Sequence, residues 1–262
     1  MKVGNICMLK LGLIGCTGKF GKDIIKYILQ SKTIILNKAI ARQANQFVGH
    51  DISLLIGSNN TGIIITDSIK DAANCDVLVD CTNKETFINN LPKYEEILKP
   101  VVIATTGFSK DDFMKINQVA KKIPIEFSPN YSFGFYNFLE TVKCAVSNLD
   151  RETDVQIIEY HHNQKKDSPS GTAIRILNAI LESNPKLIDK NININSIRAG
   201  SIVGEHRVLL ANCNNEEIEL IHKISSRESL SKGVVKSAIW LCSKPNGYYS
   251  MDDVAKDLIQ MV

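Results

Sequence analysis

The chain of 262 residues lacks a strong excess of charge of either sign. Its 31 Lys and Arg residues are nearly balanced by 28 Asp and Glu residues, the net charge is +3, and the basic residues are scattered along the chain. Proteins that bind nucleic acids usually concentrate basic residues on one face or in one block. We therefore expect no nucleic-acid partner. The apolar fraction of 44% is ordinary for a globular protein and excludes an intrinsically disordered chain.

Long hydrophobic runs are also absent. A transmembrane helix needs about 20 consecutive apolar residues, and no run in the chain approaches that length. The apolar stretch near the start runs directly into a glycine loop, with no small-residue cleavage site typical of a signal peptide. We therefore expect a soluble cytoplasmic protein with no membrane partner.

Paired cysteine and histidine motifs are missing as well. The seven cysteines are isolated from one another, and the spacings CxxC, HxH and HExxH do not occur. These spacings are typical of zinc sites, so we predict no metal ligand. An odd number of scattered cysteines indicates a reducing compartment, which agrees with a cytoplasmic location.

The first half of the chain alternates short apolar runs with segments of helical periodicity. Strands are predicted at residues 8–14, 34–41, 62–66, 76–79, 101–104 and 124–127. Strands without polar alternation that are separated by helices indicate βαβ units, whose parallel sheet is covered on both faces. The fold predicted for this half is a Rossmann-type, doubly wound α/β domain.

The second half has a different pattern. Strands are predicted at 154–160 and 195–203 with a helix at 172–181 between them, and strands at 205–213 and 216–224 flank Asn214 and Asn215. Asparagine tolerates the positive φ of a tight hairpin turn, so this half should contain a mixed sheet. We predict a dinucleotide-binding domain at 1–131, an inserted α+β substrate domain at 132–227, and a return of the chain to the first domain at 228–262.

A glycine-rich loop follows the first predicted strand and begins a helix. Gly15 can make the tight turn, Gly18 lets a pyrophosphate approach the backbone, and Gly21 lets the helix pack closely. Glycines at such positions can also serve packing alone. A Walker A loop is excluded because Lys22 is followed by Asp23 rather than by Ser or Thr. The predicted cofactor contacts in this loop are Gly15, Cys16, Thr17, Gly18, Lys19 and Phe20.

The end of the second predicted strand carries Ala41 and Arg42, where an acid would usually bind the adenosine ribose. A guanidinium group instead suits a 2′-phosphate, because it forms paired hydrogen bonds with phosphate oxygens. The alternative is an ordinary surface arginine. We expect the cofactor to be NADPH in preference to NADH, which stays possible.

Small and polar residues also follow later strands, at 80–82, 104–107 and 128–131. In a parallel sheet these strand ends lie along one edge, which is the edge where dinucleotides bind. Each position could instead be a helix cap or a turn. Further cofactor contacts are predicted at Ala104, Thr105, Thr106, Ser128, Pro129, Asn130 and Tyr131.

A run of proton donors and small polar residues spans 159–172. His161 and His162 end a predicted strand, where neighbouring side chains point to opposite sides. Histidine can exchange a proton near neutral pH, and Lys165 adds a positive charge or a second proton. The helix start at Ser170, Gly171 and Thr172 suits a carboxylate. The run therefore indicates a site for a small dicarboxylate, although a structural histidine, solvated lysines and simple helix capping are the alternatives.

The run EYHHNQKKDSPSGTA at 159–173 closely resembles the signature of the bacterial 4-hydroxy-tetrahydrodipicolinate reductases, also called dihydrodipicolinate reductases, of lysine biosynthesis. Further segments resemble this family in the same order: GCTGKFG at 15–21, ATTGF at 104–108, SPNYSFG at 128–134, IRAGSIVGEH at 197–206 and HKISSR at 222–227. The resemblance covers nearly the whole chain.

This resemblance implies that His161 is the proton donor and acceptor, that Lys165 is a second donor, and that His162, Gly171 and Thr172 hold the carboxylates. It implies hydride transfer from NAD(P)H to a cyclic imine dicarboxylate with loss of water, and a homotetramer built through the second domain. Secondary candidates for substrate contact are Arg198, His206 and Arg227. The chain departs from the family at Ala104, where glycine is common, and in a short stretch between Thr172 and Arg198.

Two other functions stay open on the sequence alone. A semialdehyde dehydrogenase or a diaminopimelate dehydrogenase could share the architecture, but the former needs a nucleophilic cysteine and no cysteine has a convincing setting at a strand end. A non-catalytic NADPH-binding sensor should lack acid–base residues, whereas His161 and Lys165 are both present.

Overall fold

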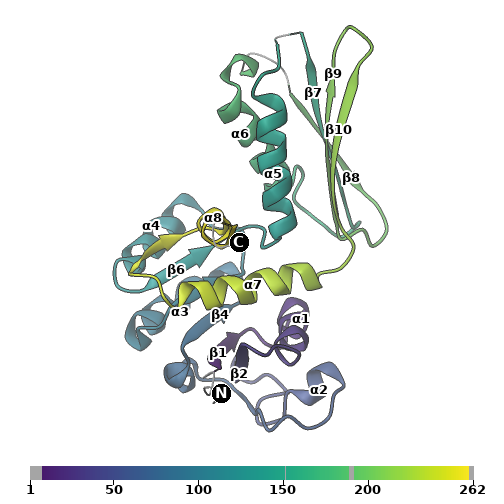
Figure 1. Cartoon of the computed structure of the whole chain (residues 1–262). Coiled ribbons are helices and arrows are strands. Elements are labelled where there is room, and N and C mark those ends of the chain that lie inside the picture. Colours follow the sequence, from purple (N-terminus) through teal and green to yellow (C-terminus); the bar gives the residue numbers. More distant parts are fainter. Residues whose placement is uncertain (1–7, 151, 189–191, 260–262) are drawn as a thin grey trace, which may run out of the picture. The chain divides into compact units, whose positions relative to one another are not determined.

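The computed structural model describes residues 8–150, 152–188 and 192–259. The chain divides into two compact units, each with its own sheet (Figure 1). The first unit extends to Tyr131 and resumes at Leu230, and the second is Ser132–Ser229. None of the described helices is long and apolar enough to cross a membrane.

The first unit contains a seven-stranded sheet in the order β11-β6-β5-β4-β1-β2-β3. All of its strand pairs are parallel, which confirms the predicted Rossmann-type sheet. The strand order reverses beside β1, and this reversal creates the crevice where such sheets bind ligands. The strands are β1 (Leu9–Ile14), β2 (Ile34–Ile40), β3 (Ile65–Thr66), β4 (Val77–Asp80), β5 (Val101–Ile103), β6 (Pro124–Phe127) and β11 (Gly247–Tyr249).

Helices follow most of these strands. Helix α1 buries Ile24, Ile25 and Ile28 along one stripe, as its periodicity requires. Strand β4 is buried along its whole length, which is the pattern of a parallel strand covered on both faces. The helices of this unit are α1 (Lys19–Ile28), α2 (Ser53–Ile56), the 3₁₀ helix η1 (Ile69–Asn74), α3 (Lys84–Ile97), α4 (Lys110–Ala120), α7 (Glu228–Leu241) and α8 (Met251–Ile259). The first two residues of α7 precede Leu230, where the first unit resumes.

The second unit is a four-stranded sheet with two long helices on one face (Figure 1). Its strand order is β10-β9-β7-β8, and only β7 and β8 are parallel, so the predicted mixed sheet is confirmed. The elements are α5 (Phe133–Val146), β7 (Asp154–His161), α6 (Gly171–Ser183), the 3₁₀ helix η2 (Pro185–Leu187), β8 (Asn193–Arg198), β9 (Gly204–Ala211) and β10 (Glu217–Ile224).

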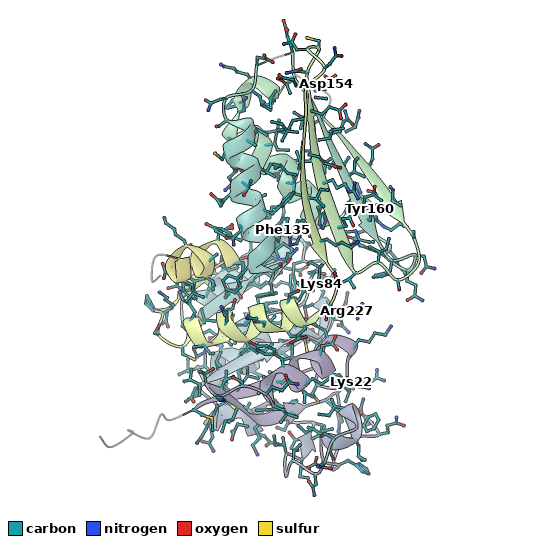
Figure 2. The ribbon with its side chains drawn as sticks, turned by 45° about the vertical axis from the view of Figure 1, so that its right-hand side comes forward. Lys22, Lys84, Phe135, Asp154, Tyr160 and Arg227 are labelled. Carbon is teal, nitrogen blue, oxygen red and sulfur yellow. The ribbon has the colours of Figure 1, made fainter. Side chains whose placement is uncertain are left out.

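Burial alternates strictly along β7 and decides which side chains face the helices. Val155 and Ile157 are buried in the core with α5 and α6, and Glu159 and His161 continue that face. Tyr160 lies on the opposite face, away from Phe135 of α5 (Figure 2). The core of this unit therefore leads directly into the part of β7 that carries the predicted acid–base residue.

Two turns explain the ends of the later strands. Asn215 has a φ of 63°, which confirms the positive-φ turn expected between β9 and β10. The prediction that a strand runs from 195 to 203 is wrong at its second end, because β8 stops at Arg198. Gly200 has a φ of 49°, so the backbone leaves the extended conformation there and turns toward β9.

Candidate functional site

The glycine loop after β1 has the close contacts that only glycine permits. Gly15 has a φ of 86°, and a β carbon there would lie 2.9 Å from the carbonyl carbon of Cys81. At Gly21 a β carbon would lie 2.5 Å from the carbonyl oxygen of Gly15, so α1 packs directly against the loop. Gly18 is the N-cap of α1 and leaves the helix start without a side chain over it. The loop therefore exposes backbone N–H groups at a helix N-terminus, a favourable place for phosphates.

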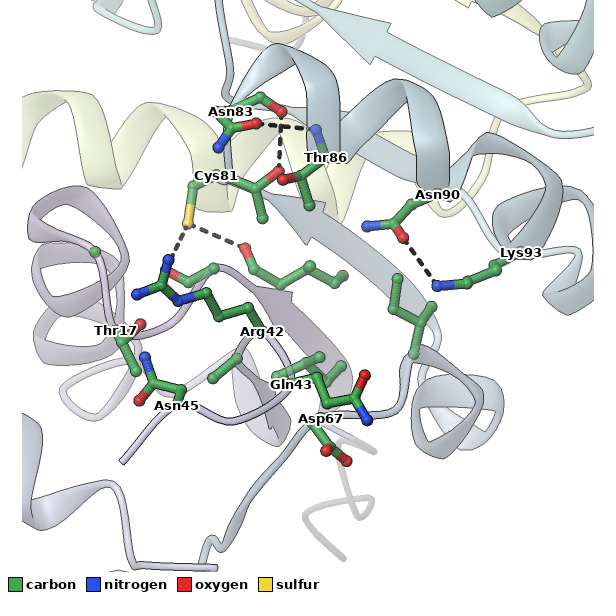
Figure 3. Close-up of a pocket in the computed structure, with 17 residues that line it drawn as sticks. Thr17, Arg42, Gln43, Asn45, Asp67, Cys81, Asn83, Thr86, Asn90 and Lys93 are labelled. Atoms are coloured by element: carbon green, nitrogen blue, oxygen red, sulfur yellow. Dashed lines mark hydrogen bonds between the residues drawn. The ribbon is translucent and has the colours of Figure 1, made fainter. Parts of the chain in front are cut away.

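A pocket of about 530 Å³ opens beside this loop, at the carboxyl ends of β1, β2, β3 and β4 (Figure 3). Four predicted cofactor residues line it, namely Gly15, Thr17, Gly18 and Arg42. The predicted residues Cys16, Lys19 and Phe20 do not line this pocket, and neither do those at 104–106 and 128–131. The pocket contains the glycine loop and the arginine that were expected to bind the phosphate-bearing half of a dinucleotide.

Sequence reasoning missed one acid in this pocket. Asp67 lines it and follows β3 directly, so it occupies a strand end like the residues that were selected. Figure 3 shows Asp67 and Gln43 at one side of the pocket and Arg42 extending toward Cys81. The sequence pattern places the ribose-binding acid at the end of the second strand, where this chain has Ala41 and Arg42. It therefore overlooks an acid at the end of the strand predicted at 62–66. A carboxylate at Asp67 is a possible acceptor for a ribose hydroxyl.

Two cysteines near the loop are protonated thiols rather than nucleophiles. Cys16 is fully buried, and burial raises its pKa to about 12. Burial and the neighbouring Asp80 raise the pKa of Cys81 well above its ordinary value, and its thiol donates to the carbonyl oxygen of Ile14 at 3.2 Å. The thiolate is the reactive form of cysteine, so neither residue is suited to nucleophilic catalysis.

The strand ends of β5 and β6 are joined by a buried hydrogen-bond network. The Tyr131 hydroxyl lies 2.7 Å from the Ile103 carbonyl oxygen and 2.9 Å from Glu126 Oε2. Burial raises the pKa of Glu126 to about 8, so a protonated Glu126 can donate to Tyr131 while Tyr131 donates to Ile103. Thr105, Ser128 and Tyr131 are buried, whereas Thr106 and Pro129 are exposed. The Tyr131 hydroxyl therefore links the ends of β5 and β6.

In the second unit, the register of the sheet assembles a polar cluster around Glu159. Glu159 on β7 pairs with Ser196 on β8 and with His206 on β9, and His206 pairs in turn with His222 on β10. Two residues further along β7, His161 lies opposite Arg198. Cross-strand partners on one face of a sheet lie within side-chain reach. Residues from four strands thus meet on the face that α5 covers.

The Glu159 carboxylate is fully buried and strongly held. Its Oε1 accepts hydrogen bonds from the Ser170 backbone N–H at 3.0 Å, from Ser196 Oγ at 2.6 Å and from Arg198 Nη2 at 2.9 Å. Burial raises the pKa of Glu159, but these hydrogen bonds and the adjacent His161 outweigh burial and hold the pKa well below its ordinary value. Glu159 is therefore an anion at neutral pH.

Three histidine rings extend from this carboxylate into the unit. The His161 and His206 rings meet edge to face at 5.2 Å, and His206 stacks on His222 at 6.4 Å. Burial and the neighbouring His161 lower the pKa of His206 to about 3, and burial lowers the pKa of His222. His206 is consequently neutral at physiological pH.

Lys165 and Arg198 form the positive side of the site. Lys165 Nζ lies 2.8 Å from both carboxylate oxygens of Asp167, and Arg198 Nη2 donates to the Asp167 carbonyl oxygen at 2.6 Å. Burial raises the pKa of Asp167, but the ion pair with Lys165 outweighs it and lowers the pKa. The secondary candidates Arg198 and His206 thus belong to the site. Among the residues that the structure describes, no recorded interaction joins Arg227 to this group, and it lies in the turn after β10.

At the start of α6, one residue caps the helix and the next is exposed to solvent. The Ser170 hydroxyl accepts from the Ala173 N–H at 3.1 Å and caps the helix, while the Ser170 N–H is bonded to Glu159. Gly171 is exposed, and a β carbon there would meet nothing within 4 Å. Thr172 is half-buried. Of the predicted carboxylate clamp, Gly171 is therefore open to solvent and Thr172 is partly accessible, whereas Ser170 caps the helix and binds Glu159.

Glu159, His161 and His206 also bring three possible metal-ligand atoms within 4.8 Å of one another. Motif spacing could not have found this group, because its members come from two strands that pair across the sheet. The guanidinium of Arg198 already provides a positive charge to the same carboxylate. A hydrogen-bonded acid–base site fits these neighbours better than a cation site.

Matches to models of known protein families identify the family of this chain. The family model described as "Dihydrodipicolinate reductase, N-terminus" matches residues 9–131, and the one described as "Dihydrodipicolinate reductase, C-terminus" matches residues 134–255. The chain belongs to the dihydrodipicolinate reductase family. Along the sequence, the first match ends at residue 131 and the second begins at residue 134, close to the boundary between the two compact units at Tyr131 and Ser132.

Curated members of the dihydrodipicolinate reductase family are similar over nearly their whole length. The 4-hydroxy-tetrahydrodipicolinate reductase of Wolbachia pipientis subsp. Culex pipiens (strain wPip) is 37% identical, covering 94% of this chain and 99% of the relative. The enzyme of the same name from Buchnera aphidicola subsp. Baizongia pistaciae (strain Bp) is 36% identical, covering 94% and 97%.

Solved structures support the fold. A dipicolinate-bound dihydrodipicolinate reductase from Paenisporosarcina sp. TG-14 has a TM-score of 0.72 at 20% identity, covering 93% of this chain and 97% of that one. An amine dehydrogenase from Mycobacterium smegmatis has a TM-score of 0.61 at 12% identity. At such identities these structures show a common architecture and carry no argument about substrate.

Proposed function

We propose that this chain is a 4-hydroxy-tetrahydrodipicolinate reductase, an NAD(P)H-dependent oxidoreductase of lysine and diaminopimelate biosynthesis. The reaction adds a hydride to a conjugated cyclic imine that carries two carboxylates, and water is lost from the hydroxylated substrate. The observation that carries the proposal is the match of both family models across residues 9–131 and 134–255. The acid–base group at His161 and Lys165 supports it independently.

The glycine loop fits a nicotinamide dinucleotide. A β carbon at Gly15 would collide with the backbone at Cys81, and the pocket beside the loop contains the arginine expected at a phosphate. When bound, the cofactor supplies the hydride from nicotinamide C4. Gly15, Thr17, Gly18 and Arg42 would hold its phosphates, and the residues at 104–106 and 128–131 would border its other end.

The substrate residues act on protons and charge. His161 would place a proton on the enamine carbon formed by reduction, and Lys165, held by Asp167, would stabilise charge at the ring nitrogen or supply a proton. His162, Gly171 and Thr172 would bind the two carboxylates. The exposed start of α6 supports the part of Gly171 and Thr172, since helix N-termini favour anions.

The proposal is tested by cofactor oxidation that depends on freshly generated 4-hydroxy-tetrahydrodipicolinate. We expect turnover with this compound, and no reduction of NADP⁺ by aspartate semialdehyde or by diaminopimelate in the opposite direction. Reduction of NADP⁺ by either compound, without turnover of 4-hydroxy-tetrahydrodipicolinate, would favour the corresponding dehydrogenase alternative. Binding of NADPH with no turnover of any of these compounds would favour a sensor.

The cofactor preference is a second part of the proposal. We expect a higher kcat/KM with NADPH than with NADH, because Arg42 lines the pocket and position 41 is alanine. The Arg42→Ala variant should lose about 10-fold to 100-fold in kcat/KM with NADPH, as one charged hydrogen-bonding group is worth about 1.5–3 kcal/mol. Its kcat/KM with NADH should change little.

Two controls sharpen this measurement. Lys26→Ala removes an exposed cation from α1 and should leave the NADPH to NADH ratio unchanged. Asp67→Asn should weaken NADH more than NADPH, because Asp67 is the carboxylate in the pocket that could accept from a free 2′-hydroxyl. Equal or better efficiency of the unmodified enzyme with NADH would contradict the preference.

We also propose a cytoplasmic homotetramer in which residues 1–131 with 228–262 bind the dinucleotide, and residues 132–227 bind substrate and make the subunit contacts. The face of the second sheet away from α5 supports such contacts. Ile197 is 39% exposed and Ile221 is 50% exposed on it, with Tyr160 and Arg207 packed between them. Exposed apolar side chains grouped on a flat sheet are typical of an interface.

The Ile221→Lys variant should break this assembly, because a lysine would bring an unpaired charge into the buried contact. Light scattering after gel filtration should give the mass of four chains for the unmodified protein and of one or two chains for Ile221→Lys. Ile64→Lys, at a 48% exposed isoleucine of the first unit, is the matched control and should keep the tetramer mass. A single-chain mass for the unmodified protein would refute the assembly.

A further inference from the structure

Glu159 is a fully buried carboxylate whose two oxygens have different surroundings. Oε1 accepts all three of its recorded hydrogen bonds, from Ser170, Ser196 and Arg198. Oε2 lies 3.3 Å from His161 Nδ1 and 4.0 Å from His206 Nε2. Among the described residues, no hydrogen bond is recorded for Oε2 or for His161 Nδ1, so these two buried atoms face each other without another partner. The carboxylate is thus anchored through one oxygen and presents the other to His161.

The anchoring makes the carboxylate rigid. Ser196 and Arg198 come from β8, which runs beside β7, and the Ser170 N–H comes from the start of α6. The donors therefore belong to two different elements of the same unit, and they fix Oε1 from different directions. A carboxylate held in this way cannot rotate without breaking hydrogen bonds to buried groups, which is costly.

An ionised carboxylate accepts hydrogen bonds and cannot donate. The imidazole nitrogen that faces Oε2 must therefore carry the proton, and the other ring nitrogen is left to exchange protons with a ligand. In His161 that second nitrogen is Nε2, and a β carbon at Gly204 would lie 3.5 Å from it. Glycine at position 204 keeps the space beside Nε2 free of a side chain.

We propose that Glu159 is a positioning residue that fixes His161 with Nδ1 protonated and presents Nε2 as the nitrogen that exchanges the proton with the substrate. This inference rests on the proposed function, since it assigns His161 the acid–base step. The other charged and titratable groups around His161 are Lys165, Asp167, Arg198, His206 and His222. His206 is the rival partner for Oε2, but its Nε2 lies 4.0 Å from Oε2, whereas His161 Nδ1 lies 3.3 Å away. His206 pairs with Glu159 across β7 and β9 and borders the site.

The test is a double-mutant cycle of Glu159→Gln and His161→Ala, measured by steady-state kinetics on the full chain. Alone, Glu159→Gln should lower kcat by about tenfold or more while KM changes less, since orientation of the base acts on the chemical step. In the His161→Ala background, the same substitution should have little further effect, because coupled residues are not additive.

Two further measurements distinguish positioning from a structural role. In Glu159→Gln, the descending limb of the pH profile of kcat should move to lower pH, because the variant lacks the negative charge beside the imidazole. Glu159→Asp keeps the charge and should recover part of kcat. Glu182→Gln makes the same chemical change on the exposed side of α6 and should leave kcat unchanged.

The outcomes separate the inference from the function on which it rests. If His161→Ala keeps near-normal turnover, the proposed catalytic site is wrong. If His161→Ala loses activity but Glu159→Gln costs the same factor in both backgrounds, only the positioning role is wrong. Loss of wild-type activity on treatment with a chelator, restored by Zn²⁺, would overturn the positioning role and assign Glu159, His161 and His206 to a metal instead.

Discussion

Replacing His161 with alanine is expected to lower kcat by roughly 100-fold to 10,000-fold, the range for loss of a general acid–base group. His161 lies beside the buried carboxylate of Glu159 and ends the strand that leads to the open start of α6. Lys165→Ala should cost about 100-fold or more, because Lys165 is the cation that Asp167 holds beside this group. Steady-state rates at saturating substrate and cofactor measure both losses.

Controls exist in the same chain for each change. His50→Ala removes an exposed histidine of the first unit, and Lys166→Ala removes the exposed neighbour of Lys165. Both should keep kcat within about twofold, since exposed single substitutions rarely have large effects. Near-normal turnover in both His161→Ala and Lys165→Ala would contradict the assignment of the catalytic residues.

Replacing Gly21 with alanine is expected to damage both stability and cofactor binding. The new β carbon would lie 2.5 Å from the Gly15 carbonyl oxygen and 3.0 Å from two Cys16 backbone atoms. Because all three are backbone atoms, rotation of a side chain cannot relieve the clash. Overpacking of this kind costs about 1–3 kcal/mol of unfolding free energy. Because the displaced backbone is the phosphate-binding loop itself, KM for the cofactor should rise about tenfold or more.

Gly18→Ala is the informative contrast, measured by thermal unfolding and by cofactor titration. Gly18 has an ordinary φ of −69°, and its β carbon would lie 3.3 Å from the Gly15 carbonyl oxygen. We expect a smaller loss of stability than for Gly21→Ala, together with weaker cofactor binding, since the methyl group stands over the helix start. Unchanged cofactor affinity in both variants would show that the loop does not bind the dinucleotide.

Much of the fold could be predicted because local patterns decide it. Most strands of the first unit show little alternation of polar and apolar residues, which is the pattern of parallel strands covered on both faces, and helices separate them. The hairpin at Asn215 was predictable from its turn chemistry. The three-residue strand β11 was missed, because so short a run has no period that distinguishes it from a loop.

The candidate site was only partly predictable, for a physical reason. His161, Lys165, Gly171 and Thr172 lie in one run whose spacing is visible in the sequence. The role of Glu159 depends on partners that come from 37 and 39 residues further along the chain and meet it only through the register of β7 and β8. Register follows from the burial of whole strands, which no short motif contains.

The most direct test of the proposed activity uses a cofactor labelled with deuterium at the transferring position of nicotinamide C4. The unmodified enzyme is incubated with freshly prepared 4-hydroxy-tetrahydrodipicolinate, and the product is analysed by mass spectrometry. The account predicts one deuterium in the tetrahydrodipicolinate ring for each cofactor molecule oxidised. Failure of the enzyme to oxidise the cofactor with this substrate, or oxidation without deuterium in the product, would contradict it.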